Sequence, residues 1–165
     1  MSSLRSRHLW LLLVSVVVIG SLAPIGVALA GGKSELSKVK KATARYHDLD
    51  KAIADGYERF LECFDLPGVG GMGQHYVDLA ALDGEAEATH PEAMVYEVRG
   101  DRLKLVAVEY VIPQSEWSDP EPPSLFGQSF HRNDNLGIWA LHAWIWRPNP
   151  LGLFEDWNPR VRLCP

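Results

Sequence analysis

Three polar residues are expected on apolar faces of three different strands: His75, Glu109 and His142. A polar side chain that is buried without a partner costs roughly 1–3 kcal/mol, so each needs a hydrogen bond, an opposite charge or a metal ion. Two imidazoles and one carboxylate can bind a divalent transition metal and leave coordination positions open. Their spacing matches no short metal motif such as HExxH, so this hypothesis requires the three side chains to converge in space.

Two alternatives to a metal site remain open. The three residues could form a buried hydrogen-bonded network in which Glu109 holds one histidine and tyrosine hydroxyls complete the set. They could also form a metal-free ligand pocket. Whether the pocket holds a metal or a metal-free ligand, its expected walls are Tyr76, Tyr110 and Trp144. The sequence contains no GxSxG motif and indicates no nucleophile, so it identifies no catalytic residues.

The segment from Trp139 to Cys164 carries four of the six tryptophans. Alternation in LHAWIW predicts a strand with His142, Trp144 and Trp146 on one face. Tryptophans on such a strand are typical of a core, although a secreted protein could also use them to stack on glycans.

A β-hairpin is predicted around Gly100-Asp101, because AMVYEVR and RLKLVAVEYVI flank a glycine suited to a type II′ turn. This register places Glu109 on the same face as Leu105 and Ala107, with Val111 next along that face, whereas a one-residue bulge would turn Glu109 to the other face. The expected cross-strand pairs are Val98 with Leu103, Tyr96 with Leu105, and Met94 with Ala107.

Other elements follow from periodicity and composition. Apolar residues at three- and four-residue steps predict one long helix over Ser34–Phe60. QHYVDL predicts a short strand with His75 and Val77 on one face. A long Pro-rich loop is expected at about 113–136, within which His131 is expected at the surface.

The N-terminal 30 residues have the pattern of a secretory signal peptide. Arg5 and Arg7 precede an apolar run, and Ala28-Leu29-Ala30 ends the segment with a small-x-small pattern. We therefore expect cleavage after Ala30 and a secreted or periplasmic protein. The alternative is an uncleaved membrane anchor, because the uncharged stretch is long enough to span a bilayer.

Export determines how the two cysteines are interpreted. An oxidising compartment favours a disulfide between Cys63 and Cys164, and a reactive thiol or a metal-binding pair is the alternative. Residues 31–165 have a formal charge of −7, from 14 basic and 21 acidic residues. Such a balance argues against a nucleic-acid partner, and this length suits one domain with a single core.

Several segments resemble a group of short secreted bacterial proteins of unknown function. The resemblance covers about Ala42 to Cys164 and implies that these segments belong to one fold, but it implies no catalytic or binding residue. The similar segments are ATARYHDLDKAIADGY, GMGQHY, LVAVEYVIP, and HAWIW followed by NPLGLF and WNP with a terminal cysteine.

The sequence therefore predicts an α+β domain, with an N-terminal helix packed on a mainly antiparallel, half-barrel-like sheet of four or five strands. The first functional hypothesis is an exported binding domain whose His/Glu pocket holds a divalent metal or a small ligand. The second is a metal-dependent hydrolase or oxygenase that uses His75, Glu109 and His142 as ligands. The third is a disulfide-stapled structural or cell-envelope interaction domain.

Overall fold

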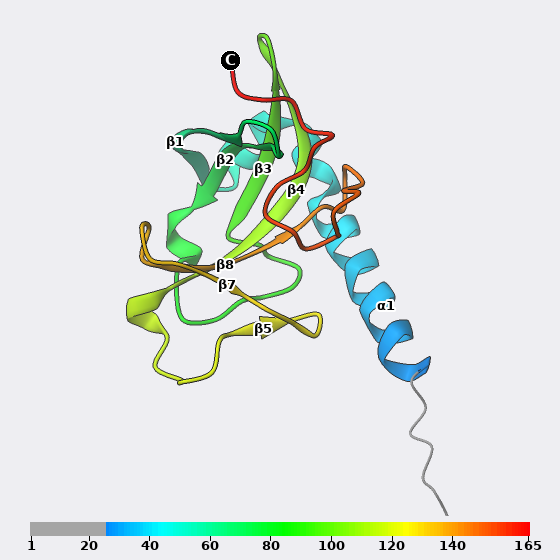
Figure 1. Cartoon of the computed structure of the whole chain (residues 1–165), viewed down its shortest axis with the longest axis vertical. Coiled ribbons are helices and arrows are strands. Elements are labelled where there is room, and N and C mark those ends of the chain that lie inside the picture. The colour runs from blue at the N-terminus through cyan, green and yellow to red at the C-terminus, as the bar shows by residue number, and fades with distance from the viewer. Residues whose placement is uncertain (1–25) are drawn as a thin grey trace, which may run out of the picture.

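The computed structural model describes residues 26–165, so most of the expected signal segment, residues 1–30, lies outside the described residues. Helix α1 (Gly26–Thr43) packs beside an antiparallel sheet of six strands that curls into a half-barrel, which confirms the α+β prediction (Figure 1). Within residues 26–165 no helix combines the length and apolar character needed to cross a membrane.

The sheet has six strands because β1 forms where a helix was expected and a short β7 forms within the expected loop. In sheet order the strands are β1 (Tyr57–Leu66), β2 (Gly70–Asp78), β3 (Ala93–Arg99), β4 (Arg102–Pro113), β8 (Ile138–Ala143) and β7 (His131–Asn133). The other elements are α2 (Leu49–Ala54), the 3-10 helices η1 (Ala44–His47), η2 (Leu79–Ala81) and η3 (Gln114–Glu116), and a small hairpin of β5 (Ser124–Leu125) and β6 (Gln128–Ser129).

The prediction of one helix over Ser34–Phe60 is wrong beyond Thr43. After α1 the chain tightens into η1, forms the short helix α2 and then turns at Gly56, whose φ of +104° lies in the left-handed region that favours glycine. Strand β1 follows at once and pairs with β2. Tyr46 and Tyr57 are both buried, with ring centroids 5.2 Å apart. The apolar spacing therefore marks residues that are buried together, although they do not lie on one continuous helix.

The face of the sheet toward the helices forms the larger core. Val39, Tyr46 and Ala52 pack there against aromatic and aliphatic side chains of β3, β4 and β8. Three buried tyrosines of this core donate their hydroxyls to backbone carbonyls. Tyr57 donates to Pro91 at 2.7 Å, Tyr96 to Tyr46 at 2.8 Å, and Tyr110 to Ala88 at 2.7 Å.

The β3–β4 hairpin forms as predicted near its turn, but it contains a bulge. Val98 pairs with Leu103 and Tyr96 with Leu105, and the register then shifts so that Met94 pairs with Val108 instead of Ala107. The extra residue turns Glu109 away from the face of Leu105. Glu109 is nevertheless only 7% exposed, because the opposite face of the sheet is also covered.

The tryptophan segment departs from a regular strand after Ala143, where β8 ends. Trp144 is buried and stacks almost parallel to the His142 ring, with centroids 5.9 Å apart. Trp146 lies in the other core, where its Nε1 donates to Thr43 Oγ1. The prediction that all three rings share one face is therefore correct only for His142 and Trp144.

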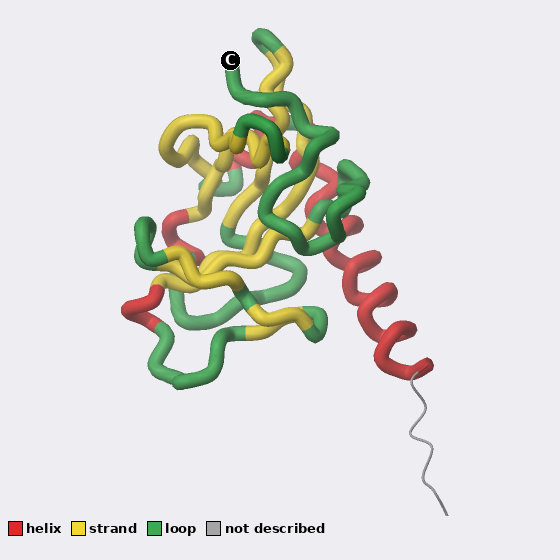
Figure 2. Tube along the Cα trace, in the orientation of Figure 1, coloured by secondary structure: helices red, strands yellow, loops and turns green. Residues whose placement is uncertain are grey.

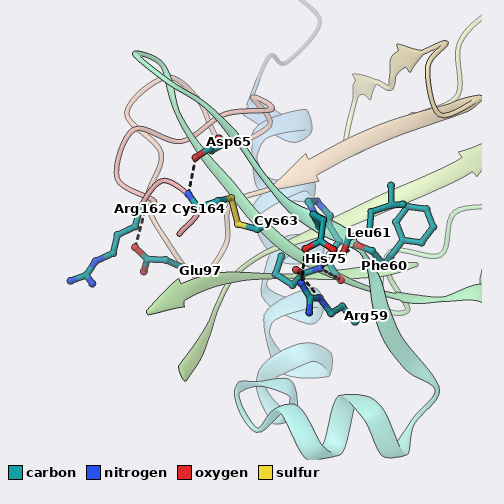
Figure 3. The surroundings of a disulfide bond; sticks show 11 residues. Arg59, Phe60, Leu61, Cys63, Asp65, His75, Glu97, Arg162 and Cys164 are labelled. Carbon is teal, nitrogen blue, oxygen red and sulfur yellow. Dashed lines mark hydrogen bonds and ion pairs between the residues drawn. A yellow bond between two sulfur atoms is a disulfide. The ribbon is translucent and has the colours of Figure 1, made fainter. Parts of the chain in front are cut away.

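Residues 144–165 form turns and loops that cover β2 and the β3–β4 hairpin (Figure 2). The predicted disulfide between Cys63 and Cys164 is confirmed, and it joins the last turn of the chain to β1 (Figure 3). Next to it Asp65 accepts the Cys164 N–H at 2.7 Å. Residues 144–165, the C-terminal tail, come so close to Gly70 that a Cβ at this glycine would meet the backbone of Asn158 at 2.5 Å. A disulfide is compatible with an extracellular or periplasmic location.

The disulfide is expected to contribute strongly to stability, because its two cysteines are 101 residues apart. Closing a loop of this length stabilises a fold by on the order of 4 kcal/mol in the chain-entropy model. A Cys63→Ser, Cys164→Ser double variant should lose about this much in urea unfolding. Reduction should destabilise the wild type to the same level and leave the variant unchanged. Equal stability of oxidised and reduced wild type would contradict the prediction.

A buried carboxyl group at the start of β3 makes the fold sensitive to pH. Glu92 is 2% exposed, and its Oε2 accepts the Val111 N–H at 3.0 Å. Burial raises the pKa of Glu92 to about 8 from its ordinary 4.5, because desolvation disfavours the charged form more than the hydrogen bond favours it.

The free energy of unfolding should therefore fall as the pH rises from about 4.5 to about 8, because the unfolded chain releases this proton first. Glu92→Gln cannot titrate, so its stability relative to wild type should increase across this range. Urea unfolding at both ends of the range measures the difference, with the exposed Glu87→Gln as the matched control. A wild-type-to-variant difference that is the same at both pH values would refute the assignment.

Candidate metal centre

The sheet brings the three predicted site residues together. His75 lies on β2, Glu109 on β4 and His142 on β8, all on the face opposite the helices. Glu109 and His142 are directly paired across β4 and β8. On its other side Glu109 pairs with Ala93 of β3, whose small side chain leaves His75 room to reach across from β2.

The carboxylate of Glu109 lies between the two imidazole rings. Its Oε2 is 3.3 Å from His75 Nε2, and its Oε1 is 3.4 Å from His142 Nε2. One donor atom from each of the three residues lies within 4.8 Å of the other two, and all three residues are buried. The sequence-based requirement for convergence is therefore met.

These spacings suit donors that share one ion. Two atoms that each lie about 2.1 Å from a metal are about 3.0 Å apart at a right angle and about 3.4 Å apart at the tetrahedral angle. The two nitrogen–oxygen distances fall at the upper end of this range. The three donor atoms taken together lie within 4.8 Å of one another, which is wider than this range, so one histidine would have to move inward to complete the ligand set.

Hydrogen bonding does not account for the group. Both His142 nitrogens and His75 Nδ1 are buried without a hydrogen-bond partner among the described residues. The tyrosine hydroxyls expected in a buried network bond instead to backbone carbonyls in the other core. Because buried polar atoms are nearly always satisfied, these imidazoles indicate a missing partner.

Burial and charge act differently on the two rings. Burial lowers the pKa of His75, since desolvation outweighs the attraction of Glu109 and the nearby His142 adds to the lowering. Burial also opposes the charged form of His142, but the carboxylates of Glu109 and Asp156 together outweigh it and raise the His142 pKa. The neutral ring that His75 favours is the form in which imidazole binds a metal.

A second carboxylate approaches the site from the segment after β8. Asp156 Oδ1 is 3.6 Å from His142 Nδ1 and 2.8 Å from His131 Nδ1. Desolvation disfavours the charge of Asp156, yet the two histidines outweigh it and hold its pKa below the ordinary value. Asp156 thus faces the nitrogen of His142 that points away from Glu109, as a carboxylate supporting a metal-bound histidine does.

His75, Glu109 and His142 line a cavity of about 590 Å³. Its walls include Phe60, Phe64 and Trp157, and the Phe64 ring contacts His75 edge-on with centroids 5.4 Å apart. His131 lies at the rim, half exposed as expected for a surface residue, but it also contributes to the site through Asp156.

The predicted pocket walls are mostly misplaced. Tyr76 and Tyr110 belong to the helix-facing core and do not line the cavity. Alternation along β2 and β4 explains this, because each tyrosine directly follows a site residue and so points to the opposite face. Trp144 lies on the correct face and supports the His142 ring from behind, although it does not line the cavity either.

Sequence reasoning missed Asp156 and the aromatic side chains of β1. Asp156 lies in an irregular segment with no periodicity, so only its position beside Trp157 in FEDWNP marks it. Phe60 falls at the end of the predicted helix and Phe64 in a stretch with no predicted element, whereas both lie on β1 and line the cavity.

Comparison with known proteins identifies no relative for this arrangement. No protein-family model matches the chain, and neither curated proteins nor solved structures give a significant match.

Proposed function

We propose that this chain is an exported domain that binds one divalent transition-metal ion through His75, Glu109 and His142. The ion presents its remaining coordination positions to the cavity, where a small ligand binds. Two histidines and one carboxylate are typical ligands of zinc and of non-haem ferrous iron, so these two metals are the first candidates.

The observation that carries the proposal is the unsatisfied state of the buried imidazoles around Glu109. A buried carboxylate between two rings would normally be held by short hydrogen bonds of about 2.8 Å. Here the nitrogen–oxygen distances are 3.3 and 3.4 Å, and His142 has no hydrogen-bond partner at either nitrogen. A metal ion would satisfy the unpartnered His142 Nε2 and would bind His75 Nε2 and the carboxylate at the same time.

A metal-dependent enzyme is the second candidate, and the cavity favours it. A metal with only three protein ligands keeps positions for water or substrate, and the ligands here open onto a space large enough for a small molecule. Zinc in such a site would activate water for hydrolysis, whereas ferrous iron would suit oxygenase chemistry. A binding domain and an enzyme share the same centre, so turnover of ester or oxidisable substrates distinguishes them.

Metal content is the direct test of the proposal. Protein purified without chelators or a His tag should contain about one equivalent of metal, measured by elemental analysis. Glu109→Gln and His142→Ala should each lose the stoichiometric metal, because each removes one of only three ligands. His90→Ala is the matched control, since His90 is exposed and lies outside the cavity.

Circular dichroism should show that the variants remain folded. If the wild type, reconstituted with zinc and with ferrous iron, binds neither ion more tightly than Glu109→Gln does, the metal centre is wrong. That result would favour a disulfide-stapled structural or cell-envelope domain.

Asp156 is expected to position His142 for the metal. Loss of a carboxylate behind a metal-bound histidine typically lowers metal affinity by about 10–100-fold. Asp156→Ala should show such a loss in competition titrations with a chromophoric chelator. Asp156→Asn should recover part of it, since an amide oxygen at this position can accept a hydrogen bond from Nδ1 when the metal holds the ring.

His131→Ala provides the control, because it removes the other partner of Asp156 without touching His142. Its effect on metal affinity should be smaller than that of Asp156→Ala. An equal loss in both variants, or a loss of stability in the metal-free protein that accounts for the whole effect, would contradict a positioning role.

A further inference from the structure

The cavity divides into a charged floor and apolar walls. The floor consists of His75, Glu109 and His142, contributed by β2, β4 and β8. The walls carry aliphatic and aromatic side chains: Phe60, Phe64, Met72, Val77, Leu82, Val111, Leu136, Ile138, Ala140 and Trp157. A ligand that fills this space therefore needs an apolar body.

Several polar groups at the rim already have partners within the protein. Arg132 Nε donates to Asp134 at 2.6 Å, and Asn133 Oδ1 accepts the Leu136 N–H at 3.2 Å. His131 is held by Asp156. These pairs leave the rim with little need for polar partners on a ligand, so the polar group that a ligand carries is best used at the floor.

The floor favours an anionic oxygen once a metal is bound. A divalent ion with one carboxylate and two neutral imidazoles carries a net charge of about +1. Of the other charged side chains that line the cavity, Arg132 and Asp134 pair with each other, and Asp156 lies beside His131 and His142. The Asp156 carboxylate lies 3.6 Å from His142 Nδ1 and 2.8 Å from His131 Nδ1, and it is not one of the three donors that would surround the ion. A monoanionic oxygen donor would neutralise the centre and occupy one of those positions.

We propose that the cavity binds a small molecule with an apolar body and a single carboxylate or phenolate group, whose oxygen binds the metal while the body fills the space between β1 and β8. This inference rests on the metal centre proposed above. The volume of about 590 Å³ lies within the range of small-molecule pockets and exceeds what water or acetate alone would fill.

The test uses the cobalt(II)-loaded protein and three probes: benzoate, acetate and benzyl alcohol. Benzoate should change the cobalt visible spectrum and bind at least about tenfold more tightly than acetate, because its ring buries apolar surface against the walls. Benzyl alcohol, which keeps the ring but lacks the anionic oxygen, should bind more weakly than benzoate. Metal-free protein should also bind benzoate more weakly.

The outcomes separate this inference from the proposed function. Stoichiometric cobalt together with equal affinities for benzoate and acetate would overturn the apolar-ligand inference and leave the metal centre intact. Unchanged benzoate affinity in the metal-free protein would likewise overturn it, because the oxygen would not be on the metal. Failure to bind cobalt at all, read by elemental analysis before any probe is added, would overturn the proposed function and this inference with it.

Variants of the cavity wall provide a second test of the proposed binding mode. Ala140 lies on β8 between Ile138 and His142 on the cavity face, so Ala140→Leu should narrow the cavity and weaken benzoate binding without loss of metal. If that variant does not fold, Leu136→Gln at the exposed rim serves instead and should weaken benzoate by a few fold. Leu151→Gln is the control, since Leu151 is exposed and outside the cavity. Benzoate affinity that is unchanged in the folded wall variants would contradict the proposed binding mode.

Discussion

The burial of Glu109 between two imidazoles is the constraint on which the candidate site depends. A carboxylate removed from water is costly unless positive charge or several hydrogen bonds surround it. Here the neighbours are His75 and His142, and neither makes a hydrogen bond to it. His142 is drawn toward its charged form by two carboxylates, while His75 is driven toward its neutral form. In the metal centre proposed above, a cation between the donors would compensate the buried carboxylate and leave both rings neutral.

The bulge in the β3–β4 hairpin creates this arrangement. Without it, Glu109 would point into the helix-facing core with Leu105; with it, Glu109 shares the cavity face with Ala107 and Val111. Both faces of β4 are buried, so the residues before and after Glu109 are buried as well. The tyrosine hydroxyls of the helix-facing core do not bond to the site: Tyr57, Tyr96 and Tyr110 donate to backbone carbonyls, and Tyr46 donates to Asp55. The polar groups on the cavity face are therefore not needed to satisfy the main core.

Short sequence patterns predicted the features that depend on neighbouring residues in the chain or on the cellular compartment. The glycine turn at Gly100, the strand around His75 and the pairing of the only two cysteines all followed from short stretches or from export. The convergence of His75, Glu109 and His142 also followed, although through a register that lacked the bulge. Periodicity failed between Tyr46 and Tyr57, because their spacing is compatible both with one continuous helix and with separate elements. Both residues are buried, but Tyr46 lies in η1 and Tyr57 in β1, on either side of the turn at Gly56. Periodicity also could not find Asp156, because an irregular segment has no period and its contact with His142 exists only in three dimensions.

The disulfide links the stability of the fold to the geometry of the site. Asp156 and Trp157 lie on the segment between β8 and Cys164, so the bond from Cys164 to β1 anchors the far end of the segment that carries them. The tail is seated on Gly70 and Gly71, where a side chain would collide with its backbone. These glycines thus allow the close approach that the tail requires, and β1 contributes Phe60 and Phe64 to the cavity wall on the other side. Cross-linking β1 to the tail restrains two walls of the cavity relative to each other. A polar floor set by strand register and walls restrained by a covalent bond together make a preorganised pocket, which would bind the proposed ligand with less loss of conformational entropy than a mobile one.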